Sequence, residues 1–189
     1  MKTNKVLATA ISAFIIGHSA PALSKNPLGS VMEFKNHKKI VYKLGLNNDK
    51  SEQLKQNLKG YLSSRSISSV EDAINYSLDF VAKSLDFRWN YFLGKKAGNY
   101  FTFPTTVKVT DCRDYAFLFS KTFDYVSKAV GLQDIKCEVV RSNDAYFLGK
   151  RIDDHDWVKV TDNKNGKVWL IDPTFYDYGL PHNLEGIVK

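Results

Sequence analysis

The sequence predicts an α+β domain, and three observations predict it. Apolar residues recur at helical spacing over residues 69–87 and again over 112–131. The pattern then changes to strand-like alternation over 135–141. A second alternating pair of runs over 153–172 is joined by a polar turn, as in an antiparallel hairpin. Helices followed by antiparallel strands are typical of an α+β rather than an α/β fold.

The first 22 residues are expected to be a secretory leader rather than part of the fold. Lys2 and Lys5 precede an apolar run over 6–17, and Ala20-Pro21-Ala22 supplies the small residues of a cleavage site. We therefore expect a periplasmic or secreted protein, with no integral membrane segment once the leader is removed. An uncleaved amino-terminal anchor is the alternative.

Residues 23–189 are numerous enough for one domain with its own core. The chain has 27 Lys and Arg against 20 Asp and Glu, so without the two leader lysines its net charge is about +5. No basic stripe accompanies this charge, so no nucleic-acid partner is expected. We expect 23–68 to be an extension that wraps the core, with a short strand over 40–46. Residues 69–189 then form the functional domain, and the protein is expected to be a monomer.

Cys112 is a candidate nucleophile at the first turn of the second helix. Thr110 or Asp111 can cap this helix, and Gly131 can end it. The unpaired N–H groups and partial positive charge of a helix start favour a thiolate. Taken alone, the position fits a buried structural cysteine equally well. The helix should pack through one apolar stripe: Ala116, Phe119, Phe123, Val126 and Val130.

Cys112 and Cys137 are expected to remain free thiols. A helix of about 18 residues is roughly 27 Å long, and Cys137 lies in the strand beyond its far end. A disulfide requires Cα atoms within about 7 Å. Cys137 is therefore expected to be a core residue beside Ile135 and Val139.

The predicted hairpin can bring His155 close to Asp172. If its loop is 163–166, Trp157 lies opposite Asp172, and His155 is one diagonal step away on the same face. A tighter turn would separate the pair by roughly 13 Å along the strand. Each residue alone also has a structural explanation, since an Asp before Pro commonly starts a turn.

The acids Asp153, Asp154 and Asp156 do not form a convincing metal site. Neighbouring residues of a strand point to opposite faces, so their carboxylates converge poorly on one ion.

Together these segments resemble the transglutaminase-like superfamily of papain-like thiol enzymes. Residues 111–116 (Asp-Cys-Arg-Asp-Tyr-Ala) are similar to its cysteine box. Residues 155–160 resemble its His-x-Trp-Val strand, and 171–174 resemble its Asp-Pro-Thr ending. Order and spacing agree over roughly 70–178. Export and small size are similar to the bacterial transglutaminase-like cysteine proteinases.

The resemblance implies a central helix bearing Cys112, packed on an antiparallel sheet bearing His155 and Asp172. These three residues would form a Cys–His–Asp triad. We therefore expect a thiol-dependent acyl-transfer enzyme, most simply a cysteine peptidase that cleaves an amide in a protein or peptide substrate. The Cys112 backbone N–H would be one oxyanion donor, with Trp89 or Tyr100 from the preceding aromatic loop as the second.

Two departures from the family pattern matter. Thr110 stands where glycine is usual, and Arg113 stands where the proteinases carry a Glu that contributes to a calcium site. We therefore expect no metal and no cofactor, and Arg113 should favour the thiolate. Two alternatives remain: a non-catalytic peptide- or protein-binding module on the same fold, or a transglutaminase or deamidase acting on glutamine side chains.

Overall fold

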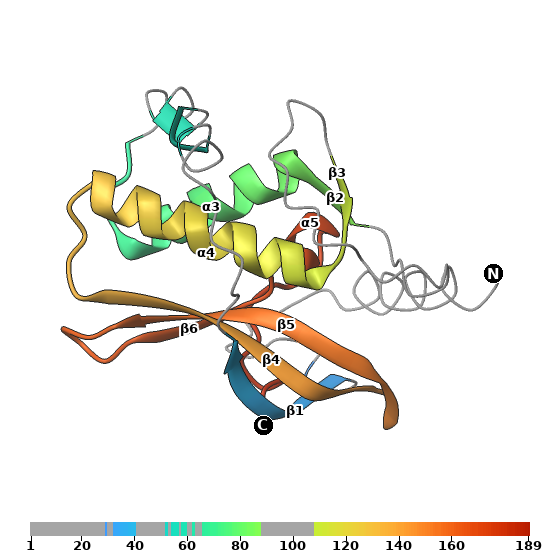
Figure 1. The fold of residues 1–189 in the computed structure, drawn as a ribbon. Helices are drawn as coiled ribbons and strands as arrows, with labels where there is room; N and C mark the ends of the chain where they lie inside the picture. The colour runs from blue at the N-terminus through green and yellow to red at the C-terminus, as the bar shows by residue number, and fades with distance from the viewer. Residues whose placement is uncertain are drawn as a thin grey trace, which may run out of the picture.

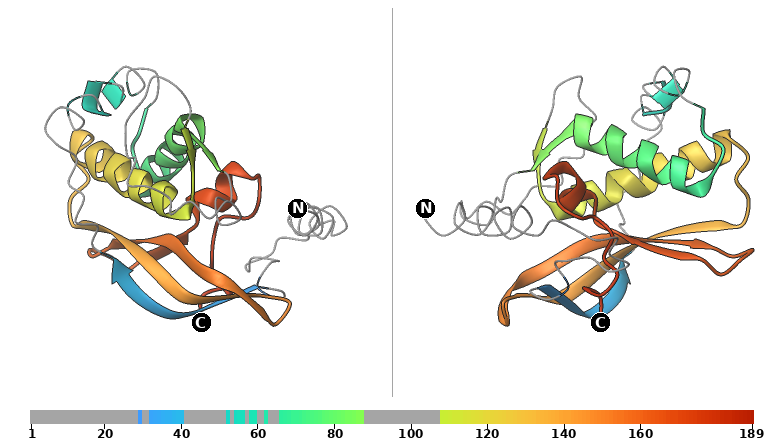
Figure 2. Two further views of the ribbon diagram at one scale, coloured as in Figure 1. Left: turned by 45° about the vertical axis from the view of Figure 1, so that its right-hand side comes forward. Right: turned by 180° about the vertical axis from the view of Figure 1, so that it is seen from behind.

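A four-stranded antiparallel sheet carries a layer of helices on one side (Figure 1). The computed structural model describes Gly29 and residues 32–40, 52, 54–56, 58–59, 62, 66–87 and 108–189. The strands lie side by side in the order β1 (Met32–Ile40), β4 (Ile135–Phe147), β5 (Lys150–Asp162) and β6 (Val168–Ile171). The helices are α3 (Val70–Ser84), α4 (Cys112–Ala129) and α5 (Pro173–Asp177), and the views in Figure 2 show them in one layer. The predicted α+β class is confirmed.

Helix α4 has the bounds that its sequence predicts. Asp111 is the N-cap, and its side chain accepts a hydrogen bond from the Arg113 N–H. At the other end Gly131 has a φ of +74°. The N–H of Gly131 donates to the Lys128 carbonyl and that of Leu132 to the Ser127 carbonyl, which is the Schellman ending.

Helix α3 begins as predicted but ends earlier. Ser69 and Asp72 form a reciprocal capping box at its start. The sequence pattern extends the helix to about 87 or 91, whereas the structure ends it at Ser84. Residues Leu85–Phe87 instead form β2, which pairs in parallel with β3 (Lys108–Thr110), the segment directly before α4. Strand pairing with a distant segment therefore overrides the local helical pattern at this end.

The hairpin of β4 and β5 is longer than the sequence pattern indicates. Each strand has 13 residues, and a bulge interrupts the register between Ser142 and Ala145. Leu148 and Gly149 at the turn both have positive φ, at 50° and 75°. This is typical of a type I′ connection. The region 143–151, expected to be a loop or a short strand pair, therefore belongs mostly to continuous strands.

The register of β5 with β6 is the one on which the predicted site depends. Thr161 pairs with Val168 and Val158 with Ile171. The Asp162 N–H donates to the Lys167 carbonyl at 2.9 Å, so residues 163–166 form the loop. The wider loop is thus confirmed, and the diagonal relation of His155 to Asp172 follows from it.

Strand β1 joins the amino-terminal part of the chain to its last residues. It forms one edge of the sheet, and its Phe34 N–H donates to the Ile187 carbonyl at 2.8 Å. The Lys189 N–H in turn donates to the Phe34 carbonyl at 3.0 Å. The strand expected over 40–46 lies, apart from Ile40, outside the described residues.

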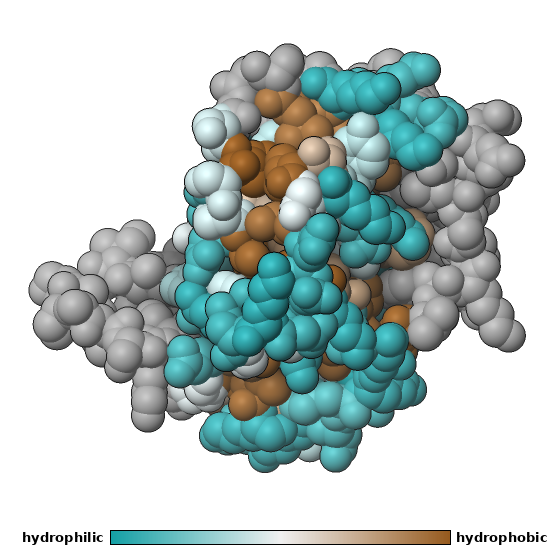
Figure 3. All heavy atoms as spheres, turned by 90° about the vertical axis from the view of Figure 1, so that its left-hand side faces the viewer, coloured by the Kyte–Doolittle hydropathy of each residue, from teal (hydrophilic) through white to brown (hydrophobic). Residues whose placement is uncertain are grey.

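Two apolar clusters form the core. The larger one fills the space between the helical layer and the sheet, and includes Ile74, Phe119 and Val158. On the face drawn in Figure 3, apolar side chains are visible in the helical layer. Hydrophilic side chains cover the end of the sheet that faces the viewer. The smaller cluster joins β1, the sheet and the carboxyl-terminal residues: Met32, Phe34, Val140, Ala145, Trp157, Phe175, Leu184 and Ile187. Val158 and Trp157 belong to different clusters, so β5 is buried on both faces at this point.

None of the helices in the described part of the chain combines the length and the apolar composition that a membrane span requires.

Candidate active site

Cys112 is the first residue of α4, where the helix meets the sheet. The helix packs against β4 and β5, and the residues Tyr115 and Ala116 behind the cysteine are fully buried. Cys112 itself remains partly exposed. The side chain of the N-cap residue Asp111 accepts a hydrogen bond from the Arg113 N–H and not from the Cys112 N–H. A partly exposed thiol at a helix start is therefore in place, with first-turn N–H groups beside it.

His155 on β5 and Asp172 after β6 form a close pair. The imidazole Nε2 lies 2.6 Å from Oδ2 of Asp172. The Asp172 side chain is completely buried, while the His155 side chain keeps 16% of its surface exposed. The structure therefore brings these two predicted residues together, with one side of the ring accessible.

The Asp172 carboxylate is fixed by a second function as the N-cap of α5. Its Oδ1 accepts hydrogen bonds from the backbone N–H groups of Thr174 and Phe175, at 2.9 and 3.2 Å. Oδ2 is then directed to His155. Since each oxygen has its own partners, the carboxylate has little freedom to rotate.

The Cys112 side chain is close enough to the imidazole of His155 to raise the pKa of that ring. Because Asp172 occupies Nε2, the nitrogen left for the sulfur is Nδ1. Burial of the ring acts to lower the pKa of His155. The charges and hydrogen bonds of Asp172 and Cys112 together outweigh burial and raise that pKa well above 6.5. The three predicted residues thus form one connected set, in the order sulfur, imidazole, carboxylate.

Two aromatic rings enclose His155 that sequence reasoning did not identify. The Phe34 and Phe175 rings lie 5.0 and 5.7 Å from the imidazole, centre to centre. Phe175 follows the Asp-Pro-Thr segment, so its position was a usable signal. Phe34 comes from residues 23–68, to which the sequence assigned no chemistry. The site therefore lies at the junction of the two apolar clusters, with the cysteine helix on one and the histidine ring on the other.

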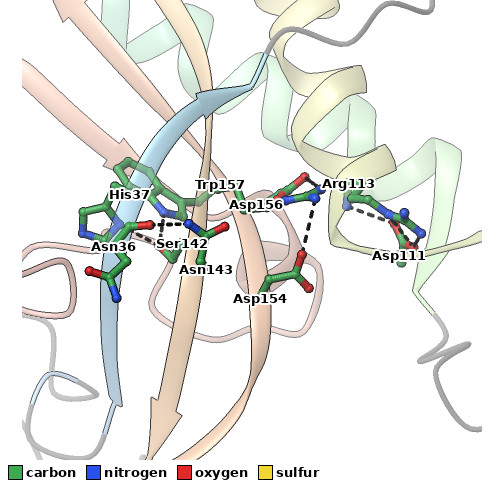
Figure 4. Close-up of polar contacts among 10 residues, drawn as sticks. Asn36, His37, Asp111, Arg113, Ser142, Asn143, Asp154, Asp156 and Trp157 are labelled. Carbon is green, nitrogen blue, oxygen red and sulfur yellow. Dashed lines mark hydrogen bonds and ion pairs between the residues drawn. The ribbon is translucent and has the colours of Figure 1, made fainter.

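A buried polar network supports β5 beside His155. Ser142 is the cross-strand partner of His155 and is completely buried. Its hydroxyl oxygen accepts from Nε1 of Trp157 at 2.8 Å and lies 2.8 Å from Nδ1 of His37. Figure 4 shows these three side chains gathered between β1 and the hairpin. Phe34 and His37 of β1 contact His155 and Trp157, so β1 packs against the strand that carries His155.

Arg113 pairs with Asp111, and the two residues flank Cys112 in the sequence. The Arg113 Nε lies 3.0 Å from Oδ2 of Asp111. This hydrogen bond is the main reason that the pKa of Arg113 is raised, and the nearby Cys112 raises it further. From the sequence we expected the positive charge of Arg113 to act on the Cys112 sulfur. In the structure that charge is paired with the Asp111 carboxylate.

A second ion pair lies on the sheet, between β4 and β5. Arg141 binds Asp156 through two bonds of 2.6 and 2.8 Å, and Asp156 is only 1% exposed. Figure 4 shows Asp156 on the sheet and the Arg113–Asp111 pair at the start of α4, and the charge of Arg141 is close enough to Arg113 to lower its pKa slightly. Asp154 also contacts Arg141, at 3.4 Å. Within the described ranges, no group of three or more His, Cys, Asp or Glu is arranged to hold a metal ion.

Cys137 differs from Cys112 in the surroundings of its thiol, although both side chains are partly exposed. Both thiols are free, as the helix length predicted. Cys137 packs against the larger cluster, and burial raises the pKa of its thiol far above the usual range. Cys112 is therefore the reactive candidate.

Some predicted features lie outside the described residues. These are the two candidate oxyanion donors, Trp89 and Tyr100, and the leader over 1–22. Comparison with models of known protein families gave no match, and comparison with curated proteins gave none either.

Proposed function

We propose that the protein is an exported thiol-dependent acyl-transfer enzyme with Cys112, His155 and Asp172 as its catalytic triad. A papain-like, transglutaminase-like core and cleavage of an amide in a protein or peptide form part of the proposal. One observation carries it: the imidazole of His155 is held 2.6 Å from a fixed, buried carboxylate, and Cys112 at the start of α4 is close enough to raise the pKa of that ring. Nucleophile, base and orienting group in this order form the general arrangement for covalent acyl transfer.

The first half of the reaction forms a thioester. His155 Nδ1 takes the proton of Cys112, and the sulfur attacks the carbonyl carbon of the substrate amide. The tetrahedral intermediate collapses, the C–N bond breaks, and the imidazolium gives its proton to the departing amine. The raised pKa of His155 supports this step, because it makes the imidazole a stronger base toward the thiol. Asp172 keeps Nδ1 directed at the sulfur through its bond to Nε2.

The second half releases the acyl group to an acceptor. In a peptidase the acceptor is water: His155 takes one of its protons, the oxygen attacks the thioester, and the C–S bond breaks. Both intermediates carry a negative oxygen that needs donors. The Cys112 N–H suits this role, because the Asp111 cap bonds to the next residue instead.

Reaction with a warhead selective for thiol proteases, such as a peptidyl epoxide, tests the proposal. Mass spectrometry should find a single adduct on Cys112. Cys112→Ala should abolish it, and the matched control Cys137→Ala should leave it unchanged, because desolvation raises the pKa of that thiol and keeps it protonated. His155→Ala should slow the labelling strongly. Labelling of both thiols at the rate of a free cysteine would refute the triad.

The acyl acceptor is tested separately. Protein substrates cut in a Cys112-dependent manner would establish hydrolysis of the peptide bond. Incorporation of a labelled primary amine into a glutamine-containing protein would instead show transfer, and conversion of glutamine to glutamate would show deamidation. If Cys112→Ala retained all partner binding and biological effect, the binding-module alternative would replace the enzyme.

A further inference from the structure

The buried hydroxyl of Tyr115 joins the cysteine helix to α5. Tyr115 lies three residues after Cys112, about one turn along α4, and its side chain has no exposed surface. Its hydroxyl donates a hydrogen bond of 2.6 Å to Oδ2 of Asp177. A bond of this length from a hydroxyl to a carboxylate is of the stronger, charge-assisted kind.

Helix α5 depends on such contacts for its position. It has five residues, from Pro173 to Asp177, and a helix of that length is not stable alone. It is bonded to both longer helices by a tyrosine–carboxylate pair. Tyr115 of α4 binds Asp177, and Tyr176 of α5 binds Asp79 of α3.

Helix α5 also carries the acid of the proposed triad. Asp172 is its N-cap, and two amides of its first turn hold the carboxylate. Any shift of α5 relative to α4 therefore moves Asp172, and with it the bonded ring of His155, relative to the sulfur. The hydrogen bond between Tyr115 and Asp177 therefore links the helix that carries Cys112 to the helix that Asp172 caps.

We propose that Tyr115 is a positioning residue: its bond to Asp177 sets the spacing between Cys112 and the His155–Asp172 pair. This inference rests on the proposed function and assigns no chemical step to Tyr115. Tyr115→Phe removes only the hydroxyl and keeps the buried ring. Tyr176→Phe is the matched control, since it removes the same kind of bond from the same short helix, but on the side of α3.

The test measures the rate of Cys112 alkylation by iodoacetamide against pH, with the full-length chain and circular dichroism as a check of folding. The wild-type rate at about pH 6 is the reference. Tyr115→Phe should lower the rate at about pH 6 by at least about tenfold and move the acid limb of the profile to higher pH, because small displacements of paired reacting groups are costly. Tyr176→Phe should stay within about twofold of the wild type.

Asp177→Leu provides an independent route to the same contact. It should reproduce the Tyr115→Phe profile, and the double variant should be no slower than either single one, as expected for one shared bond. The inference is overturned if Tyr115→Phe retains the wild-type profile, or if Tyr176→Phe shifts it equally. A wild-type chain that itself titrates as an ordinary thiol would instead remove the proposed triad, so the two failures are distinct.

Discussion

Replacing Asp172 should separate its role toward His155 from its role as a helix cap. Asp172→Ala removes both, whereas Asp172→Asn keeps an oxygen for the amides of Thr174 and Phe175. Loss of a cap costs about 1 kcal/mol, and each buried donor left without an acceptor costs about 1–3 kcal/mol. Both amides belong to buried residues. With two such donors, we therefore expect Asp172→Ala to lower the free energy of unfolding by about 2–6 kcal/mol and Asp172→Asn by about 1 kcal/mol or less.

The two variants should be equally poor as catalysts despite this difference in stability. The asparagine amide can only donate toward Nε2 of His155, which forces the ring proton onto Nδ1. The nitrogen facing Cys112 then cannot accept its proton. Loss of the correct tautomer in a triad typically lowers the rate on the order of 10⁴-fold.

Chemical denaturation gives the stability, and the rate of Cys112 labelling by the peptidyl epoxide gives the reactivity without a known substrate. The expected result is a nearly wild-type midpoint for Asp172→Asn together with a labelling rate lowered at least about a hundredfold. Wild-type labelling by Asp172→Asn would refute the catalytic role of the carboxylate. An equal loss of stability in both variants would refute the capping argument.

Three further predictions concern stability. Arg141→Ala should cost about 3–5 kcal/mol in urea denaturation because it removes the paired guanidinium from buried Asp156, and a loss under about 1 kcal/mol would contradict this. The pKa of His155 is raised in the folded protein, so this group stabilises the fold fully below about pH 6.5 and its contribution is lost as pH rises through the raised value. Burial lowers the pKa of His182, so that group destabilises the fold as pH falls below about 6.5. His182→Gln should therefore flatten the acid side of the stability profile, and an unchanged acid side would exclude this role. Gly131→Ala should cost about 1 kcal/mol in thermal unfolding because of its φ of +74°, and an unchanged midpoint would disprove the strain.

Much of the fold was predictable because the signals that set it are local. Asp111 and Gly131 fix the ends of α4 through hydrogen bonds that span only a few residues. Side chains of a strand alternate with a period of two, so a loop over 163–166 determined which residues share a face with Asp172. Where the prediction failed, as at the end of α3, a strand pairing between residues about 23 positions apart replaced a continuing helix.

The sequence by itself determined which residues could meet: a cysteine at a helix start, and a histidine and an aspartate on one face of a hairpin. Only the tertiary structure decided that the helix start lies against that hairpin, that Phe34 from the amino-terminal strand lies beside the imidazole, and that Tyr115 reaches Asp177. The physical reason is range. Caps and alternation depend on neighbours along the chain, whereas these contacts join residues about 40 to 120 positions apart and form only when the packing of the whole core brings them together.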